Sequence, residues 1–267
     1  MPDIFDLLRR WWKPVTGVVL LSLLAVGIIT FLKPRQYLSV ATAVPASSMA
    51  ADKGRIFNEN IQELYSALGY PDDLDKVVGT AALDTVYLAV AAAFNLYDHY
   101  KIKDEENALL KSARELKSNS TVLKSDYGEL KIKVWDTDKN LAPQLANAIL
   151  ANLDALHRDL QNAGNQASLK ALEQRLQTLR RTSDSATADQ KIKLLAEAAG
   201  YEKLINEYHV LAEAKPPVLI TVEKAKPALH PDRPQRLKIM LATAAFSFLF
   251  AILAALAFDS KRQNDQQ

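Results

Sequence analysis

The sequence predicts an α+β membrane protein in which two transmembrane helices flank an extramembrane α/β base domain with long helices. Three observations lead to this prediction. Residues 15–32 and 239–258 contain no charged residue, and a helix that spans a bilayer needs about 20 apolar residues. Between these runs, apolar residues alternate in some segments and recur every three or four residues in others. Those two spacings are typical of strands and of helices.

The composition of the 267 residues excludes several classes of protein. The chain has no Cys, which excludes a disulfide framework and any Cys-ligated metal site. Its 33 Lys and Arg stand against 31 Asp and Glu, for a net charge of +2. That balance gives no basis for nucleic-acid binding, and the two apolar runs argue against a wholly soluble protein.

The first apolar run, residues 15–32, is predicted to be an uncleaved anchor behind a head of residues 1–14. The basic residues before it would suit a signal peptide, but the small residues 41–43 lie too far beyond the run for a cleavage site. Trp11 and Trp12 precede the run, as interfacial Trp residues do. We therefore expect the run to remain in the membrane.

The second run, residues 239–258, is long enough to span and leaves a tail of residues 259–267. Ala251 and Ala255 form a small-xxx-small pair, which suits membrane-helix packing.

Two spans place both termini on one side of the membrane. The basic residues at the outer ends of the spans are Arg9, Arg10, Lys13, Lys261 and Arg262. Those at the inner ends are Lys33, Arg35, Arg233, Arg236 and Lys238. This balance leaves the orientation open.

The pattern of residues 37–117 predicts one strand followed by helices. We predict a strand at 37–44, a helix at 55–69, a short helix at 72–79, an Ala-rich core helix at 81–98 and a charged helix at 104–117. The helix at 81–98 carries acidic and amide residues, so it is assigned to the core and not to a third span.

The pattern then changes to strands. Leu130, Ile132 and Val134 alternate with polar or amphipathic residues, which predicts a half-buried strand. Residues 120–124 are its expected hairpin partner, and Tyr127-Gly128 suggests the turn between them.

Two long helices are predicted next, at about 139–181 and 188–213, separated by the polar stretch 182–189. Asp138 or Asn140 can cap the first of them, and Gly164 is a candidate bend. An antiparallel pair or a larger bundle would bury the apolar stripes of both helices. Their predicted packing seam, spaced 3-4-3 as in a coiled coil, is Leu169, Leu172, Leu176 and Leu179.

Residues 216–234 form a Pro-rich segment that leads into the second apolar run. Residues 218–223 alternate as a strand, and Pro227, Pro231 and Pro234 follow. Because Pro fixes φ and removes N–H donors, this piece should be extended and stiff. One interpretation is a strut that couples the extramembrane domain to the membrane helix. The other is an ordinary Pro-rich linker.

Four stretches, in this order around two spans, resemble the Wzz-type polysaccharide chain-length determinants, also called polysaccharide co-polymerases. They are IFDLLRRWWKPV (4–15), KPRQYLSVATAVPA (33–46), GELKIKVWDTDKNLAPQLANAILANLDA (128–155) and PALHPDRPQRLKIM (227–240). The chain departs from the family in its short middle and in a second span without Pro or Gly.

The resemblance implies a protein of the bacterial inner membrane with cytoplasmic termini and a periplasmic middle, residues 33–238. Family members form homo-oligomeric rings and set the modal length of a polysaccharide of the O-antigen type in lipopolysaccharide. The implied partners are further copies of the chain, a polysaccharide polymerase, the growing polysaccharide and the lipid bilayer, with no nucleic acid. Family members have no catalytic residues of their own and use no cofactor.

Motifs for chemistry are missing from the sequence. It has no G-x-x-x-x-G-K-[ST] phosphate-binding loop, which the related co-polymerases fused to a kinase require. The four His residues lack metal-ligand spacing. We therefore predict no catalytic, cofactor-binding or metal-binding residue.

Two other functions stay open. One is an adaptor for capsule or exopolysaccharide export that partners a separate kinase, although the tail 259–267 holds no Tyr. The other is a two-span sensor or a structural coiled coil.

Overall fold

The computed structural model describes residues 4–46, 72–103, 106–185 and 187–264, so the predicted helix 55–69 lies outside the described residues. The chain forms two compact units. Residues 1–37 and 228–267 form the first, which we call the membrane unit. Residues 38–227 form the second, which we call the body.

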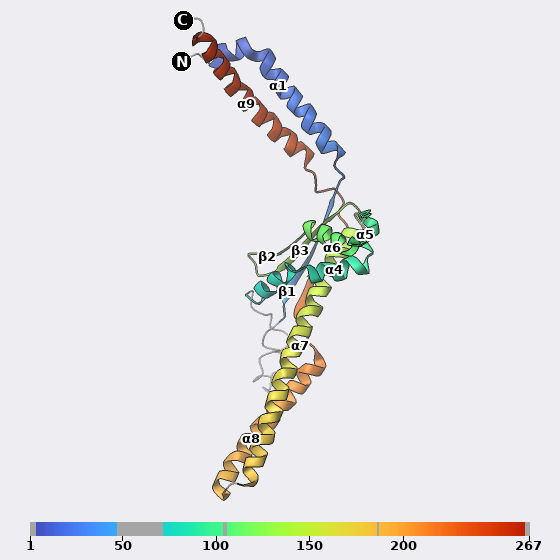
Figure 1. Ribbon diagram of the computed structural model, residues 1–267, viewed down its shortest axis with the longest axis vertical. Coiled ribbons are helices and arrows are strands. Elements are labelled where there is room, and N and C mark those ends of the chain that lie inside the picture. The colour runs from blue at the N-terminus through green and yellow to red at the C-terminus, as the bar shows by residue number, and fades with distance from the viewer. Residues whose placement is uncertain (1–3, 47–71, 104–105, 186, 265–267) are drawn as a thin grey trace. The chain divides into compact units, whose positions relative to one another are not determined.

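The membrane unit consists of two long helices, α1 (Ile4–Leu32) and α9 (Arg236–Asn264), which lie side by side (Figure 1). Arg9–Leu32 and Arg236–Phe258 are long and apolar enough to cross a membrane. Most of their side chains face outward, because only 11% of either apolar window is buried. The predicted fold class, with two candidate transmembrane helices flanking a body of helices and sheet, is confirmed.

A bent pair of helices in the body would also satisfy the criteria for a span. Helices α3 (Asp73–Ala81) and α4 (Asp84–Ala93) meet at 63°. Taken as one bent span, they are also long and apolar enough to cross a membrane. The described residues therefore contain two candidate spans, or three if this pair counts as one. Val86, Val90 and Ala91 of α4 lie in the hydrophobic core of the body, which agrees with the core assignment predicted for residues 81–98.

The body is built on a four-stranded sheet with the order β2-β3-β1-β4. β1 (Tyr37–Pro45) pairs antiparallel with β4 (Leu219–Glu223), and the register shifts between Thr42 and Ala43. β2 (Ser120–Lys124) and β3 (Leu130–Asp136) form the predicted antiparallel hairpin. Gly128 in its turn has φ 75°, a conformation that glycine adopts without steric cost.

The single helix expected at 81–98 is wrong, because the chain breaks there twice. Leu83 is extended, with ψ 147°, so α3 ends at Ala81 and α4 starts at Asp84. Asn95 is left-handed, with φ 49°, and separates α4 from the short α5 (Leu96–His99). Asn tolerates this conformation better than most residues. The Ala-rich composition favoured one helix, but the chain breaks at two exposed residues, Leu83 and Asn95, and buries Val90 and Leu96 between and after them.

The remaining helix of this region is shorter than expected. α6 (Ala108–Ser118) begins four residues after the predicted start at 104 and is amphipathic, with Ala113 and Leu116 buried.

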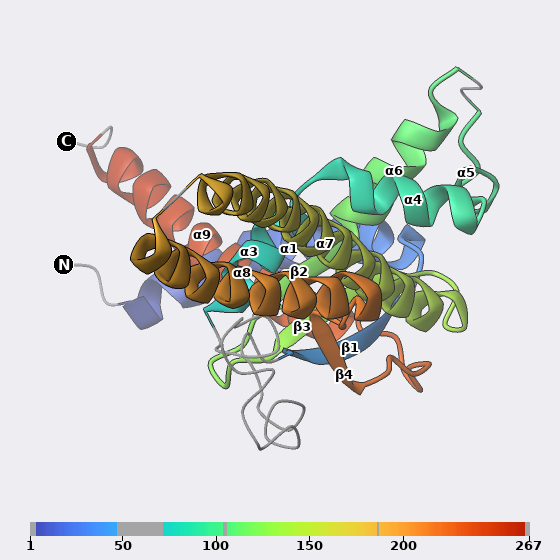
Figure 2. The ribbon, with the colours of Figure 1, turned by 90° about the horizontal axis from the view of Figure 1, so that it is seen from below.

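Two helices extend the body into an antiparallel hairpin, α7 (Leu141–Asp184) and α8 (Ala188–Ala214). They lie side by side in both views (Figures 1 and 2). α7 has 44 residues and continues through Gly164 without a break, which makes it about 66 Å long at 1.5 Å per residue. Thr187 caps α8 in a capping box with Gln190. Asn140 is at the N-cap position of α7, and Asp138 accepts its backbone N–H at 2.8 Å.

The core of the body lies between the sheet, the short helices and the first turns of α7. Leu130, Ile132 and Val134 of β3 are fully buried, as their alternation predicted. The fully buried leucines and isoleucine that helices contribute are Leu74, Leu96, Leu116, Leu145, Ile149 and Leu153. Since three of these lie near the start of α7, that end of the helix belongs to the core, and the rest packs against α8.

Candidate functional site

The proline-rich segment runs from β4 to α9 without regular secondary structure apart from one isolated bridge. Pro227 and Pro231 are exposed, and Pro234 is half-buried. Hydrogen bonds hold the backbone of this segment on both sides of Pro227, and we take this anchored segment as the candidate site.

Before Pro227, the segment is bonded to two elements of the body. The Asn147 side chain of α7 binds the backbone of Ala225 twice. Its Nδ2 donates to the carbonyl oxygen at 3.3 Å, and its Oδ1 accepts the N–H at 2.9 Å. Ser39 of β1 is 2% exposed, and its hydroxyl donates to the carbonyl oxygen of Lys226 at 2.9 Å. The segment therefore leaves the body from a position fixed by both α7 and β1.

After Pro227, the segment is bonded within the membrane unit. Gln36 donates its N–H to the Arg233 carbonyl at 2.9 Å, and its own carbonyl accepts the N–H of Asp232 at 2.9 Å. Pro231 and Pro234 flank Asp232 and Arg233, so positions with fixed φ lie on both sides of the residues that bond to Gln36. The segment leading into α9 is thus paired with the residues that follow α1.

A second side chain of α7 fixes the entry to β4. Asp154 Oδ1 accepts the N–H of Val218 at 2.8 Å and the N–H of Leu219 at 2.9 Å, and its Oδ2 lies 3.4 Å from Arg158 Nε. Asn147 and Asp154 are seven residues apart, which places them on one face of the helix. The sequence analysis missed both. Their only signal was two short polar side chains at that spacing beside leucines.

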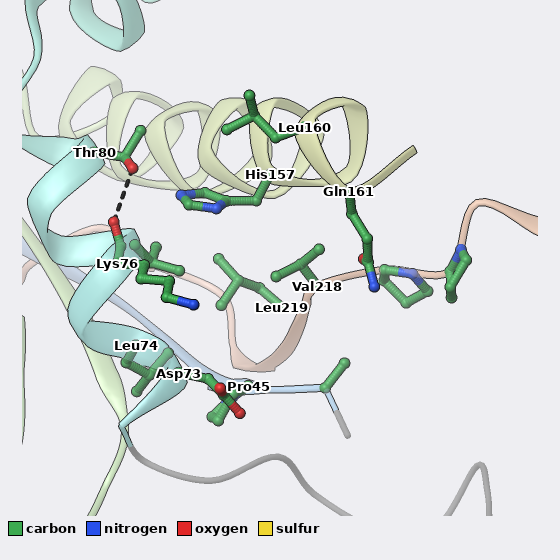
Figure 3. A pocket seen from close by; sticks show the side chains of 14 residues that line it. Pro45, Asp73, Leu74, Lys76, Thr80, His157, Leu160, Gln161, Val218 and Leu219 are labelled. Carbon is green, nitrogen blue, oxygen red and sulfur yellow. Dashed lines mark hydrogen bonds between the residues drawn. The ribbon is translucent and has the colours of Figure 1, made fainter. Parts of the chain in front are cut away.

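A pocket of about 580 Å³ lies in the body beside this entry (Figure 3). Leu74, Val77 and Leu219 supply apolar lining, and Lys76 and Gln161 supply polar groups. His157 projects from α7 toward α3 (Figure 3). Its Nε2 is buried without a hydrogen-bond partner among the described residues. Burial lowers the pKa of His157, and the charge of Asp154 opposes that shift.

The predicted Leu seam lies on α7, which packs along α8. Leu179 is 4% exposed, and Leu169, Leu172 and Leu176 are half-buried. On α8 the buried apolar residues are Ala198, Ile205, Tyr208 and Leu211. Ion pairs cross between the two helices from Arg175 to Glu197 and from Arg180 to Glu202. These pairs are exposed, so each adds little to stability. That the Leu seam stabilises the hairpin stays a prediction.

The predicted small pair of α9 lies against α1. Ala251 and Ala255 are buried in one cluster with Val15, and Trp11 and Leu256 pack on it. The Trp11 ring also stacks on Phe258, with centroids 6.3 Å apart.

A buried polar cluster at the end of β3 was not predicted. Asp136 is 2% exposed and accepts hydrogen bonds from His99 Nε2 at 2.9 Å, the Tyr100 hydroxyl at 3.3 Å and the Asp138 N–H at 2.8 Å. Burial, and next the charge of Asp136, raise the pKa of Tyr100. The cluster connects the end of α5 to the residues just before α7.

No group of three or more potential ligands in the described part of the chain could hold a metal ion.

Comparison with known proteins gives matches among solved structures only. No family model and no curated protein matches the chain. The chain is similar to a full-length bacterial polysaccharide co-polymerase over 100% of both chains, at 13% identity and a TM-score of 0.43. It is also similar to a fragment of WzzB from Salmonella Typhimurium over 74% of this chain and 100% of that one, at 14% identity and a TM-score of 0.36. Both are polysaccharide co-polymerases. That is the family the sequence resembles.

Proposed function

We propose that the chain is a non-enzymatic regulator of polysaccharide chain length in the bacterial inner membrane. The supporting observation is the arrangement of its parts. Two candidate spans pack together as one unit, and the body lies between them in the sequence. The chain enters α9 through the anchored proline segment. The four sequence stretches that resemble the chain-length determinants occur in this order.

In this role the protein acts as a scaffold for a separate polymerase. The termini are cytoplasmic, the body is periplasmic, and several copies form a ring. The α7–α8 hairpin extends the body, and the growing polysaccharide, of the O-antigen type, passes along the assembled ring. The protein supplies positions for other molecules, and it needs no cofactor or catalytic residue of its own.

The proline segment is the proposed coupling element. Asn147 and Ser39 bind its backbone before Pro227, and Gln36 binds it beyond Pro231. Proline fixes φ at Pro227, Pro231 and Pro234, which reduces the backbone freedom of the segment. The segment therefore has less backbone freedom than an ordinary linker of its length.

The test is the ladder of surface lipopolysaccharide on a gel, from a host whose own length regulator is deleted, with and without this chain. We expect the chain to restore a cluster of bands at one length without stopping synthesis. The matched control is an empty vector, with protein abundance in the inner membrane measured in both strains. A ladder that stays random despite abundant protein would contradict the proposal and favour the export-adaptor function.

A further inference from the structure

Four of the five basic residues at the inner ends of the spans lie next to or within the ends of the two membrane helices. Lys33 and Arg35 follow the end of α1, and Arg236 and Lys238 lie in the first turn of α9. We call these four residues the basic collar. The hydrogen bonds between Gln36 and Asp232–Arg233 join the two segments that carry them.

Arg236 connects the collar to the membrane helix directly. Its guanidinium carbon lies 4.5 Å from the centroid of the Phe31 ring, a distance at which a cation is attracted to the ring face. A guanidinium that uses its flat face in this way keeps N–H donors at its edge, where they suit phosphate oxygens. The contact therefore holds one cation of the collar at the last turn of α1.

The charge of the collar is not neutralised by nearby acids. Asp232 is the only acidic residue in 33–37 and 228–238. Lys33, Arg35 and Lys238 are exposed. Within the described parts of the chain, none of the ion pairs includes a collar residue. The collar can therefore bind an anion without first breaking a salt bridge.

The position of the collar indicates which anion this is. Phosphate groups of lipids lie just outside the hydrocarbon layer, at the level where a spanning helix ends. Basic residues directly beside a span normally favour the cytoplasmic side. In the orientation that the proposed function assigns, the collar lies on the opposite side. Since the basic residues at the two ends of the spans are balanced, the collar is not needed to set the orientation and can serve to bind phosphate on the side of the body.

We propose that the basic collar binds the phosphate headgroups of anionic phospholipids in the leaflet that borders the body. Lys33, Arg35 and Lys238 supply exposed ammonium and guanidinium donors, and Arg236 supplies a fixed one. The orientation step rests on the proposed function, whereas the charge, the exposure and the Arg236–Phe31 contact do not.

The test uses the full chain in phosphatidylcholine vesicles that contain trace spin-labelled phosphatidylglycerol or spin-labelled phosphatidylcholine. Electron spin resonance measures the fraction of each label held at the protein surface. We expect a preference for phosphatidylglycerol of about threefold, since this headgroup carries a net negative charge that attracts basic residues at low salt, whereas phosphatidylcholine carries none. The preference should fall toward one as NaCl rises from about 0.05 to 0.5 M, where screening is strong. No preference at low salt would overturn the proposal without any variant being needed.

Matched variants locate the site. One carries Lys33→Gln, Arg35→Gln and Lys238→Gln, and the control carries Arg9→Gln, Lys13→Gln and Lys261→Gln at the outer ends of the spans. Both lose three positive charges. We expect the first to lose at least about half of the preference and the control to retain it, because Asp3, Asp6, Asp259 and Asp265 offset the basic residues at the outer ends. Equal losses would show that net charge alone decides, and no loss in the first variant would exclude the collar. Either result overturns the proposal.

A further arm separates lipid from soluble anion. Inorganic phosphate is compared with NaCl at equal ionic strength, and we expect equal effects on the bound phosphatidylglycerol. Displacement by phosphate beyond that of NaCl would assign the collar to a soluble phosphate group and overturn the lipid assignment. Failure in any arm leaves the chain-length role standing, because that role is measured on the lipopolysaccharide ladder.

Discussion

At the scale of single residues, two side chains of α7 bind backbone groups that belong to the β4 region. Asn147 satisfies both polar groups of Ala225, and Asp154 accepts the N–H groups of Val218 and Leu219. Ala225 is 7% exposed, so water has little access to these groups. Removing such a partner leaves buried donors or acceptors unpaired, which costs more than the net value of the bond.

We expect Asn147→Ala to lower the free energy of unfolding by about 2 kcal/mol, because it leaves the N–H and carbonyl of Ala225 unpaired. Thermal unfolding of the full chain in detergent, followed by circular dichroism, measures the change. Asn152→Ala is the matched control, since the hydrogen bond of Asn152 within the described residues goes to Ala148 of its own helix. An effect of Asn147→Ala no larger than that of the control would contradict the anchoring role.

His157 gives a pH dependence whose sign follows from its pKa. Burial lowers that pKa below the ordinary value of 6.5. Between the two values the unfolded chain binds a proton that the folded chain does not. The free energy of unfolding that depends on neutral His157 is therefore fully present above about pH 6.5 and is lost as the pH falls through the lowered pKa.

We expect His157→Gln to flatten the decline in stability between pH 7.5 and 5.5, as measured by thermal unfolding at both values. The effect is partial, because the side chain is only half-buried. The unchanged chain, measured at the same two pH values, is the reference. An unchanged slope in His157→Gln would show that other groups set the pH dependence.

At the scale of elements, the proline segment and the helical hairpin are held by different interactions. The segment is bonded at Ala225, Lys226, Asp232 and Arg233, and stiff proline positions lie among these bonds. The hairpin depends on the contact between the apolar faces of α7 and α8, because its crossing ion pairs are exposed.

We expect the double change Pro231→Ala and Pro234→Ala to broaden the distribution of polysaccharide lengths with little loss of protein, because it makes the backbone more flexible. The lipopolysaccharide ladder and an immunoblot of the membrane fraction measure the two quantities. Changing Pro2 to Ala in the head is the matched control. An unchanged modal length at equal abundance would contradict the coupling role.

We expect Leu179→Ala to destabilise the hairpin by about 2 kcal/mol, at the lower end of the range for buried leucines. Leu195→Ala on α8 removes the same atoms from a side chain that is 52% exposed and should change stability by less than about 0.5 kcal/mol. Thermal unfolding of both variants gives the comparison. Equal effects would show that Leu179 does not form part of the packing seam.

At the scale of the whole molecule, the chain passes twice between the membrane unit and the body, at residues 37–38 and 227–228. Two spans place both termini on one side of the membrane. The proposed orientation puts these termini in the cytoplasm and the body in the periplasm.

The chain has no Cys, so single introduced cysteines report this topology directly. We expect Ser185→Cys, between α7 and α8, to react with a membrane-impermeant maleimide added after the outer membrane is permeabilised. Asn264→Cys near the end of α9 should react only after the inner membrane is opened. The reverse pattern would invert the orientation, and labelling of both residues before the inner membrane is opened would contradict the two-span topology.

The sequence by itself determined the features that depend on local pattern and composition. These are the two apolar runs, the β2–β3 hairpin, the long helices and the break near Ser185. Each follows from a periodicity or a turn residue within a short window, as the alternation of Leu130, Ile132 and Val134 illustrates. Such windows contain the physical information that selects helix, strand or span.

Tertiary structure alone decided the features that join distant residues. The breaks at Leu83 and Asn95 overrode an Ala-rich helical pattern, because packing outweighs intrinsic propensity. The bond between Asn147 and Ala225 spans 78 positions in the chain. The contact of Arg236 with Phe31 joins the two ends of the sequence. Hydrogen bonds and charge contacts depend on positions in space. The periodicity of a short sequence window therefore does not predict which distant backbone group a side chain will contact.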